Sequence, residues 1–211
     1  MMNNTENINY PAPKQEYTLL VWCATFNHSK YIEDTLNGFA MQQTDFPFVC
    51  LVMDDASTDG EQEVIKVWME RECDMSRAET IDIPTSVVII VPHKTNLSCT
   101  FAFYLLKQNL YGTGKKIYYL NPWREKCIYE AICEGDDYWI DPLKLQKQVC
   151  FLDEHEDYGL IHTNYKLSNN QIHNIAVYND DKYEEGLISG KCSIATLTVM
   201  YRISLYKLLP K

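Results

Sequence analysis

The chain has 211 residues, of which 46% are hydrophobic and 23% are charged, and its formal net charge at pH 7 is −10. This composition excludes a disordered polymer and predicts a globular protein with one substantial core. The acidic balance argues against a nucleic-acid-binding protein, which needs a basic face to release counterions from the phosphates. A nucleotide is still compatible with this charge as a ligand, because a divalent cation and backbone N–H groups can bind its phosphates.

Residues 1–16 are polar and include Pro11 and Pro13, without the basic and apolar segments of a signal peptide, so we expect a loose polar leader. The apolar runs of the chain are shorter than the roughly 20 residues that a membrane-spanning helix needs. Eight cysteines occur without a C-x-x-C pair, which favours buried reduced thiols over disulfides or zinc sites. These features predict a cytoplasmic protein, with a peripheral contact to the inner face of the membrane left open.

Strand-like and helix-like patterns alternate three times between residues 17 and 110. Each strand pattern is a continuous apolar run, typical of a buried parallel strand, and each helix pattern has apolar residues three and four positions apart. The alternation predicts an α/β fold with a mostly parallel sheet flanked by helices. The expected strands cover 17–24, 48–53 and 87–91, and the expected helices cover 30–41, 62–72 and 101–110.

The second half of the chain is less regular. Residues 111–127 contain two glycines, a proline and paired lysines, which predicts an irregular surface insertion. A short apolar run up to Cys133 predicts the next strand. A helix is expected over 142–154, with Asp141 as its N-cap, Pro142 at its first position and Lys144 on its solvated face. Further strand patterns cover 158–165 and 194–201, and the residues between them, 166–193, are polar and weakly patterned.

The most informative motif is Glu134-Gly135-Asp136-Asp137, which follows the strand that ends at Cys133. Three carboxylates within four residues repel one another unless a positive charge lies between them. Carboxylate oxygens are the ligands that Mg²⁺ and Mn²⁺ prefer, and such ions keep coordination places open for phosphate oxygens. The alternative interpretation is a solvated acidic turn in front of a helix, which is common for short motifs of this kind.

A second acidic motif, Asp54-Asp55, follows the strand expected at 48–53. Because the carboxyl ends of parallel strands meet at one edge of a sheet, the two acidic motifs should converge on a single crevice. The loop Thr25-Phe26-Asn27 at the end of the first strand adds an aromatic ring to that crevice. An aromatic ring, a hydrogen-bonding acid and a cluster of acids suited to a metal ion together favour a nucleoside diphosphate as the ligand.

These segments resemble the GT-A-fold family 2 glycosyltransferases, the nucleotide-sugar-dependent inverting enzymes of bacterial polysaccharide synthesis. The likeness covers roughly residues 17–165 and is most specific from Glu134 to Gln148, with a weaker echo from Thr196 to Arg202. It implies transfer of a sugar from a nucleoside-diphosphate sugar, UDP-sugars being favoured, to a saccharide or lipid-linked acceptor. The transfer would be metal-assisted and would invert the anomeric carbon.

The resemblance also implies roles for individual residues. Phe26 matches the aromatic beside the nucleobase, and Asp55 matches the acid that hydrogen-bonds the base, with Asp54 supporting it. Asp136 matches the ligand of Mn²⁺ or Mg²⁺, and Glu134 would face the ribose or the metal. Asp137 would either support the metal ligand without touching the metal or be aimed at the donor sugar. The nucleotide-binding residues implied in this way are Ala24, Thr25, Phe26, Asn27, Asp54, Asp55 and Glu134.

The chain departs from the family at two places. Residues 96–102 lack the glycine and the arginine that the family shows after its third strand. The general base that deprotonates the acceptor is also unidentified, because the family places it after a segment like 196–202. We therefore expect 17–165 to be the nucleotide-sugar-binding core and 166–211 to be the incomplete start of an acceptor-side region. The candidates for the general base are the late acids, which all lie in polar surroundings: Asp180, Asp181, Glu184 and Glu185.

Two alternative functions remain at this stage. A nucleotide-sugar-binding module without turnover would share the fold and the ligand, and only the missing base would distinguish it from an enzyme. A nucleotidyltransferase would also use acids at strand ends and a metal ion, but it needs a glycine-rich phosphate loop near its N-terminus. Residues 21–30 contain no glycine, which argues against that alternative.

Overall fold

The computed structural model describes residues 10–167, 172–173 and 194–208 of the chain. These residues form a mixed α/β structure around one eight-stranded sheet, with a separate two-stranded sheet beside it. The strands are β1 (Leu19–Thr25), β2 (Phe48–Asp54), β3 (Glu79–Ile83), β4 (Ser86–Pro92), β5 (Cys99–Leu106), β6 (Tyr129–Ile132), β7 (Leu160–Ile161), β8 (Tyr165–Lys166), β9 (Ile172–His173) and β10 (Met200–Arg202).

The centre of the large sheet is parallel. Its strand order is β3-β4-β5-β2-β1-β6-β10-β7, and the four neighbours β5, β2, β1 and β6 all run in one direction. Every residue of β2 is buried. A strand that is covered on both faces needs a continuous apolar run rather than an alternating one, and this is the pattern that its sequence has. The expected α/β fold with a mostly parallel sheet is confirmed.

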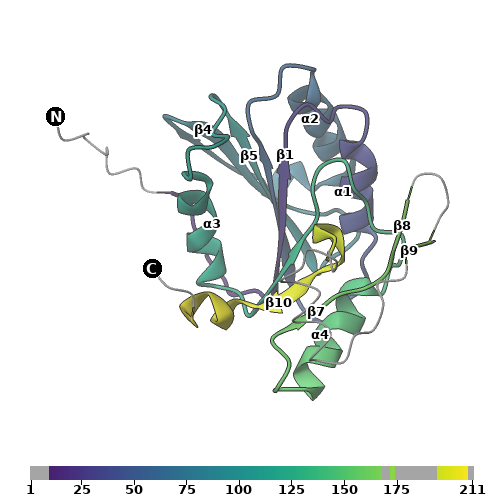
Figure 1. The fold of residues 1–211 in the computed structure, drawn as a ribbon. Helices are drawn as coiled ribbons and strands as arrows, with labels where there is room; N and C mark the ends of the chain where they lie inside the picture. Colours follow the sequence, from purple (N-terminus) through teal and green to yellow (C-terminus); the bar gives the residue numbers. More distant parts are fainter. Residues whose placement is uncertain (1–9, 168–171, 174–193, 209–211) are drawn as a thin grey trace.

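Helices cover both faces of this sheet (Figure 1). One hydrophobic core joins the sheet to α1, α2 and α4, and the fully buried indole of Trp68 lies in it. A second core on the opposite face joins the sheet to α3 through Trp123. The α-helices are α1 (Ile32–Ala40), α2 (Glu61–Glu72), α3 (Lys116–Arg124) and α4 (Lys144–Glu154), and the 3₁₀ helices are η1 (Met75–Arg77), η2 (Thr196–Thr198) and η3 (Ile203–Leu208).

The helix expected over 101–110 is wrong, because most of this segment is strand β5. β5 lies between β2 and β4, so its side chains are buried against both cores, and Phe101 and Tyr104 point to opposite faces. An unbroken apolar run satisfies a helical period and a doubly buried strand equally well. The strand expected at 87–91 exists as β4, but it pairs with β5 in the antiparallel direction. The strand that pairs with β2 in the parallel direction is β5.

The irregular insertion expected over 111–127 is also wrong, because residues 116–124 form helix α3. Tyr119, Leu120 and Trp123 give this helix a buried face. The Trp123 indole N–H donates to the hydroxyl of Tyr104 on β5 at 2.7 Å. This tertiary contact stabilises a helix whose interior Pro122 and flanking glycines would otherwise argue against it.

Three expected boundaries need smaller corrections. Helix α4 begins at Lys144 rather than at Pro142, although Asp141 Oδ1 still accepts a hydrogen bond from the N–H of Leu143 at 2.9 Å. In the stretch 158–165 only short β7 and the start of β8 are strands. In 194–201 the chain first forms η2, and β10 covers only Met200–Arg202.

Side-chain placement brings two further findings. Lys144, expected on a solvated surface, is buried. Seven cysteines lie among the described residues as free thiols, of which Cys150 is exposed rather than buried. None of the helices in the described parts of the chain is long and apolar enough to cross a bilayer.

Candidate functional site

Both acidic motifs lie at the carboxyl end of β1. The N–H of Asp55 donates to the carbonyl oxygen of Thr25 at 2.9 Å, and the N–H of Gly135 donates to that of Ala24 at 3.3 Å. β1 is paired with β2 on one side and with β6 on the other, so it brings the loops that follow these two strands together. The convergence expected from the parallel sheet is therefore present in the structure.

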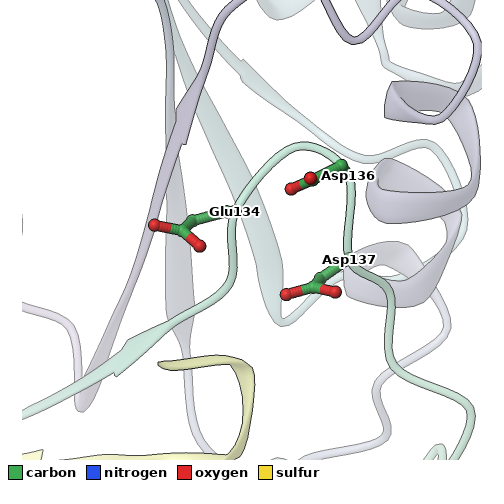
Figure 2. Close-up of side chains that lie close together, drawn as sticks. All are labelled: Glu134, Asp136 and Asp137. Carbon is green, nitrogen blue, oxygen red and sulfur yellow. The ribbon is translucent and has the colours of Figure 1, made fainter. Parts of the chain in front are cut away.

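Residues Glu134–Asp137, called the acidic turn below, follow β6 directly. Glu134, Asp136 and Asp137 each offer an oxygen atom, and these atoms all lie within 4.8 Å of one another. Figure 2 shows the three carboxylates gathered around the bend of the turn. Burial, together with the negative charges of Asp136 and Glu134, raises the pKa of Asp137 above its usual range. His28 Nε2 lies 3.8 Å from Asp136 Oδ2, but the three carboxylates still outnumber it. Hard oxygen donors and a local excess of carboxylates both fit a divalent cation such as Mg²⁺ or Mn²⁺.

The backbone of the acidic turn is packed tightly against its neighbours. The hydroxyl of Thr35 on α1 donates to the carbonyl oxygen of Asp137 at 2.7 Å and lies 3.1 Å from that of Gly135. A Cβ atom at Gly135 would lie 1.9 Å from Thr25 Oγ1 and 2.4 Å from Thr25 Cβ. Only glycine allows this close approach between the acidic turn and the end of β1.

A buried carboxylate that the sequence analysis missed supports the loop after β1. Glu61, in the first turn of α2, accepts hydrogen bonds from the Thr25 hydroxyl, from the N–H of His28 at 2.8 Å and from the Ser57 hydroxyl at 2.8 Å. It ties the loops after β1 and β2 to the start of one helix. Thr58 and Glu61 have the spacing of a capping box, but α2 begins at Glu61 with Gly60 as its N-cap, so this local pattern does not indicate the role of Glu61.

The loop after β1 presents Phe26 to solvent. Phe26 is 42% exposed, whereas Thr25 is buried. Asn27 has a left-handed φ of 59° and is tied to the loop after β2: its N–H donates to Ser57 Oγ at 2.9 Å, and its Oδ1 accepts from the Thr58 N–H at 2.8 Å. Non-glycine residues with a left-handed φ store backbone strain, which is a recurring feature of ligand-binding loops. Of this loop, the Phe26 ring is the part available to stack on a ligand.

The two acids after β2 are both buried. Asp54 Oδ1 accepts hydrogen bonds from the N–H of Ser57 at 3.0 Å and from the Gln62 side chain at 2.6 Å. Asp55 is 1% exposed, and both of its carboxylate oxygens are engaged. Leu110 N–H donates to Oδ1 at 2.6 Å, and Lys116 Nζ lies 2.8 Å from Oδ2. A direct hydrogen bond from Asp55 to a nucleobase stays a prediction, and Lys116 is a site residue that the sequence analysis missed.

The segment 196–198 reaches the acidic turn from the other side. The hydroxyl of Thr196 donates to Glu134 Oε2 at 3.3 Å. The segment 196–198 is held in place by the Trp139 indole, which donates to the carbonyl of Leu197 at 2.8 Å, and by the Gln148 amide, which donates to that of Thr198 at 3.0 Å. This segment, in the part of the chain where the resemblance to the family is weaker, thus lies beside the acidic turn.

Lys144 lies beneath this segment. Its ammonium group is 4.4 Å from the centre of the Trp139 ring and donates to Gln148 Oε1 at 2.6 Å. Burial lowers the pKa of Lys144 from 10.5 to about 7, although Cys133 and Asp141 act in the opposite direction. Between these two pKa values the unfolded chain binds a proton that the folded chain does not, so the free energy of unfolding rises with pH.

We expect the pH-dependence of the free energy of unfolding that Lys144 causes to be lost in Lys144→Met. Below about pH 7 the cost of burying the ammonium group is fully present, and it disappears as the pH rises towards 10.5. The free energy of unfolding of the wild type should therefore rise by about 2 kcal/mol relative to the variant between about pH 7 and pH 9. Urea denaturation at several pH values measures it. Lys147→Met, which changes an exposed lysine on the same helix, should show no such trend, and parallel curves for wild type and Lys144→Met would contradict the expectation.

The candidates for the general base stay predictions. Asp180, Asp181, Glu184 and Glu185 lie outside the described residues, and their role stays a prediction. A cavity of about 420 Å³ lies on the α2 side of β4 and β5, and it shares Ala56 and Ser57 with the loop after β2 but no residue with the acidic turn. The geometry of the candidate site therefore depends on the strand ends rather than on that cavity.

Two kinds of known protein are similar to this chain. No family model matches it. Protein Rv1520 of Mycobacterium tuberculosis and protein Mb1547 of Mycobacterium bovis, both described as uncharacterized, are each 35% identical to it over 133 residues. The match covers 63% of this chain and 31% of either relative, so the chain spans about a third of their length.

Solved structures show the fold. TarS of S. aureus in complex with UDP-GlcNAc has a TM-score of 0.57 at 20% identity, over 90% of this chain and 46% of TarS. The mannosyltransferase PcManGT of Pyrobaculum calidifontis, in complex with GDP-Man and Mn²⁺, has a TM-score of 0.54 at 17% identity, over 94% of this chain and 48% of that one. The chain has the α/β fold of these GT-A glycosyltransferases.

Proposed function

We propose that this chain is a glycosyltransferase that binds a nucleoside-diphosphate sugar at the carboxyl end of β1. The observation that carries the proposal is the acidic turn, whose three carboxylates converge beside the exposed ring of Phe26 and the loop after β2. The complexes of TarS with UDP-GlcNAc and of PcManGT with GDP-Man and Mn²⁺ support it, because both share this fold. We further propose a UDP-sugar as the donor and a saccharide or lipid-linked acceptor in polysaccharide synthesis.

In this proposal Asp136, with Glu134 and Asp137, holds Mn²⁺ or Mg²⁺. A bound divalent ion supplies positive charge that stabilises a departing diphosphate. The ring of Phe26 stacks on the base, Glu134 accepts hydrogen bonds from ribose hydroxyls, and Asp137 faces the donor sugar. The acceptor hydroxyl attacks the anomeric carbon from the face opposite the diphosphate, which inverts that carbon. A carboxylate such as Asp180 removes the proton of the hydroxyl, with Asp181, Glu184 and Glu185 as the other candidates.

A screen of donors tests this function. Thermal unfolding would be followed with UDP-GlcNAc, other UDP-sugars and GDP-mannose, each with Mn²⁺, with Mg²⁺ and with EDTA. A ligand that binds only the folded chain raises the free energy of unfolding by about 2.7 kcal/mol at a hundredfold excess over Kd. We expect stabilisation by at least one nucleotide sugar, and only with metal. Release of the nucleoside diphosphate then separates an enzyme from a binding module, and a lack of any metal-dependent stabilisation would refute the proposal.

A further inference from the structure

The ion pair between Asp55 and Lys116 exposes only its positive member. The ammonium nitrogen of Lys116 lies 2.8 Å from Asp55 Oδ2, with the Lys116 side chain 28% exposed and that of Asp55 1% exposed. A ligand that approaches the end of β2 therefore meets the ammonium group of Lys116, while the carboxylate behind it is out of reach.

The surrounding loop holds Asp55 in its ion pair with Lys116. Its main-chain oxygen accepts a hydrogen bond from Asn109 Nδ2 at 2.9 Å, and Oδ1 accepts from the N–H of Leu110 at 2.6 Å. Its own N–H is bonded to Thr25, the residue before Phe26, which places the ion pair at the same strand end as the exposed ring.

Helix stability does not explain a lysine at position 116. Lys116 is the first residue of α3, where the helix dipole disfavours a positive charge. Its neighbour Lys115 is exposed. Of these two lysines, Lys116 is the one that contacts Asp55. An ammonium group has three N–H donors, of which Asp55 takes one, leaving donors free for a ligand.

We propose, on the basis of the proposed function, that Lys116 reads the nucleobase by donating a hydrogen bond to a base carbonyl oxygen. Asp55 then positions Lys116 and does not touch the base. Uracil offers two carbonyl oxygens and guanine offers one, whereas adenine offers none. The site should consequently select uridine and guanosine nucleotides over adenosine nucleotides. Among the described residues, Lys116 is the specificity-determining residue of the donor site.

Calorimetric titration with UDP, GDP and ADP in the presence of Mn²⁺ tests this assignment. We expect the wild type to bind UDP at least about tenfold more tightly than ADP, the size of one hydrogen bond to a charged group. Lys116→Met should remove that preference by weakening UDP and GDP alone. Lys116→Arg, which keeps a donor, should retain it, and Lys115→Met is the matched control that should change nothing.

Because Lys116→Met leaves a buried carboxylate without its partner, the double variant Asp55→Asn/Lys116→Met is included to keep the fold intact. It should show the same loss of preference. Equal weakening of UDP and ADP by Lys116→Met would show that the lysine contacts the diphosphate, and unchanged UDP affinity would show that it contacts nothing. Either result overturns this inference alone. A wild type that binds no nucleotide with Mn²⁺ would overturn it together with the proposed function.

Discussion

Replacing Asp136 by asparagine should abolish metal-dependent binding of a nucleoside diphosphate while the fold stays intact. Asp136 is the exposed central acid of the acidic turn, and its oxygen lies within 4.8 Å of those of Glu134 and Asp137. In the proposed metal site the substitution removes a ligand, and we expect Mn²⁺-dependent affinity for UDP to fall by at least about a hundredfold, beyond the loss typical of supporting residues. Titration calorimetry with and without Mn²⁺ gives the two affinities.

The same variant has a second readout that needs no metal. The charge of Asp136 is one of the causes that raise the pKa of Asp137, so that pKa should move down towards its ordinary value in Asp136→Asn. NMR titration of the Asp137 carboxyl carbon follows this shift. Asp157→Asn, at an exposed acid between α4 and β7, is the matched control. UDP affinity that is unchanged by Asp136→Asn in the presence of Mn²⁺ would remove the residue from the metal site.

Gly135→Ala should disrupt the site through packing alone. The new Cβ atom would lie 1.9 Å from Thr25 Oγ1 and 2.4 Å from Thr25 Cβ, so the acidic turn or the end of β1 must move. Thr25 has little freedom to yield, because its hydroxyl is bonded to the buried carboxylate of Glu61. We expect a loss of about 1–3 kcal/mol in the free energy of unfolding, the usual cost of overpacking, together with loss of Mn²⁺-dependent nucleotide binding.

Gly159→Ala is the appropriate control for this substitution. Its Cβ atom would meet Leu205 Cδ1 at 2.9 Å, but that atom is the end of a flexible side chain that can turn away. Urea unfolding and titration with UDP and Mn²⁺, run on both variants, separate the two cases. Wild-type stability and metal-dependent affinity in Gly135→Ala would mean that the close approach between the acidic turn and β1 is not required.

Some features of the fold could be predicted because they depend on short-range patterns. The continuous apolar runs of β1 and β2 indicate doubly buried strands, and the apolar spacing before and after Phe39 indicates an amphipathic helix. The strand-end position of the acidic turn follows from the apolar run that precedes it. In each case the signal lies within a few residues, and alternative structures would leave apolar side chains in water or polar ones in the core.

The errors occurred where local patterns allow more than one structure. The segment around Phe101 and Tyr104 is apolar on every side, so it fits a helix as well as a strand between two cores. The turn-forming residues near Pro122 suggest a loop, and a helix is stabilised there by the packing of its buried face, including the contact of Trp123 with Tyr104. Contacts between residues far apart in the sequence decide both cases, and no local pattern encodes them.

The sequence by itself determined the α/β class with its mostly parallel sheet and the acids at two strand ends, because periodicity and side-chain chemistry are local properties. Only the tertiary structure decided which groups those acids meet. Glu61 bonds the loops after β1 and β2, and Lys116 neutralises Asp55 from a helix that the sequence did not indicate. A buried carboxylate must find donors or a cation, but which residue supplies them depends on how distant segments pack.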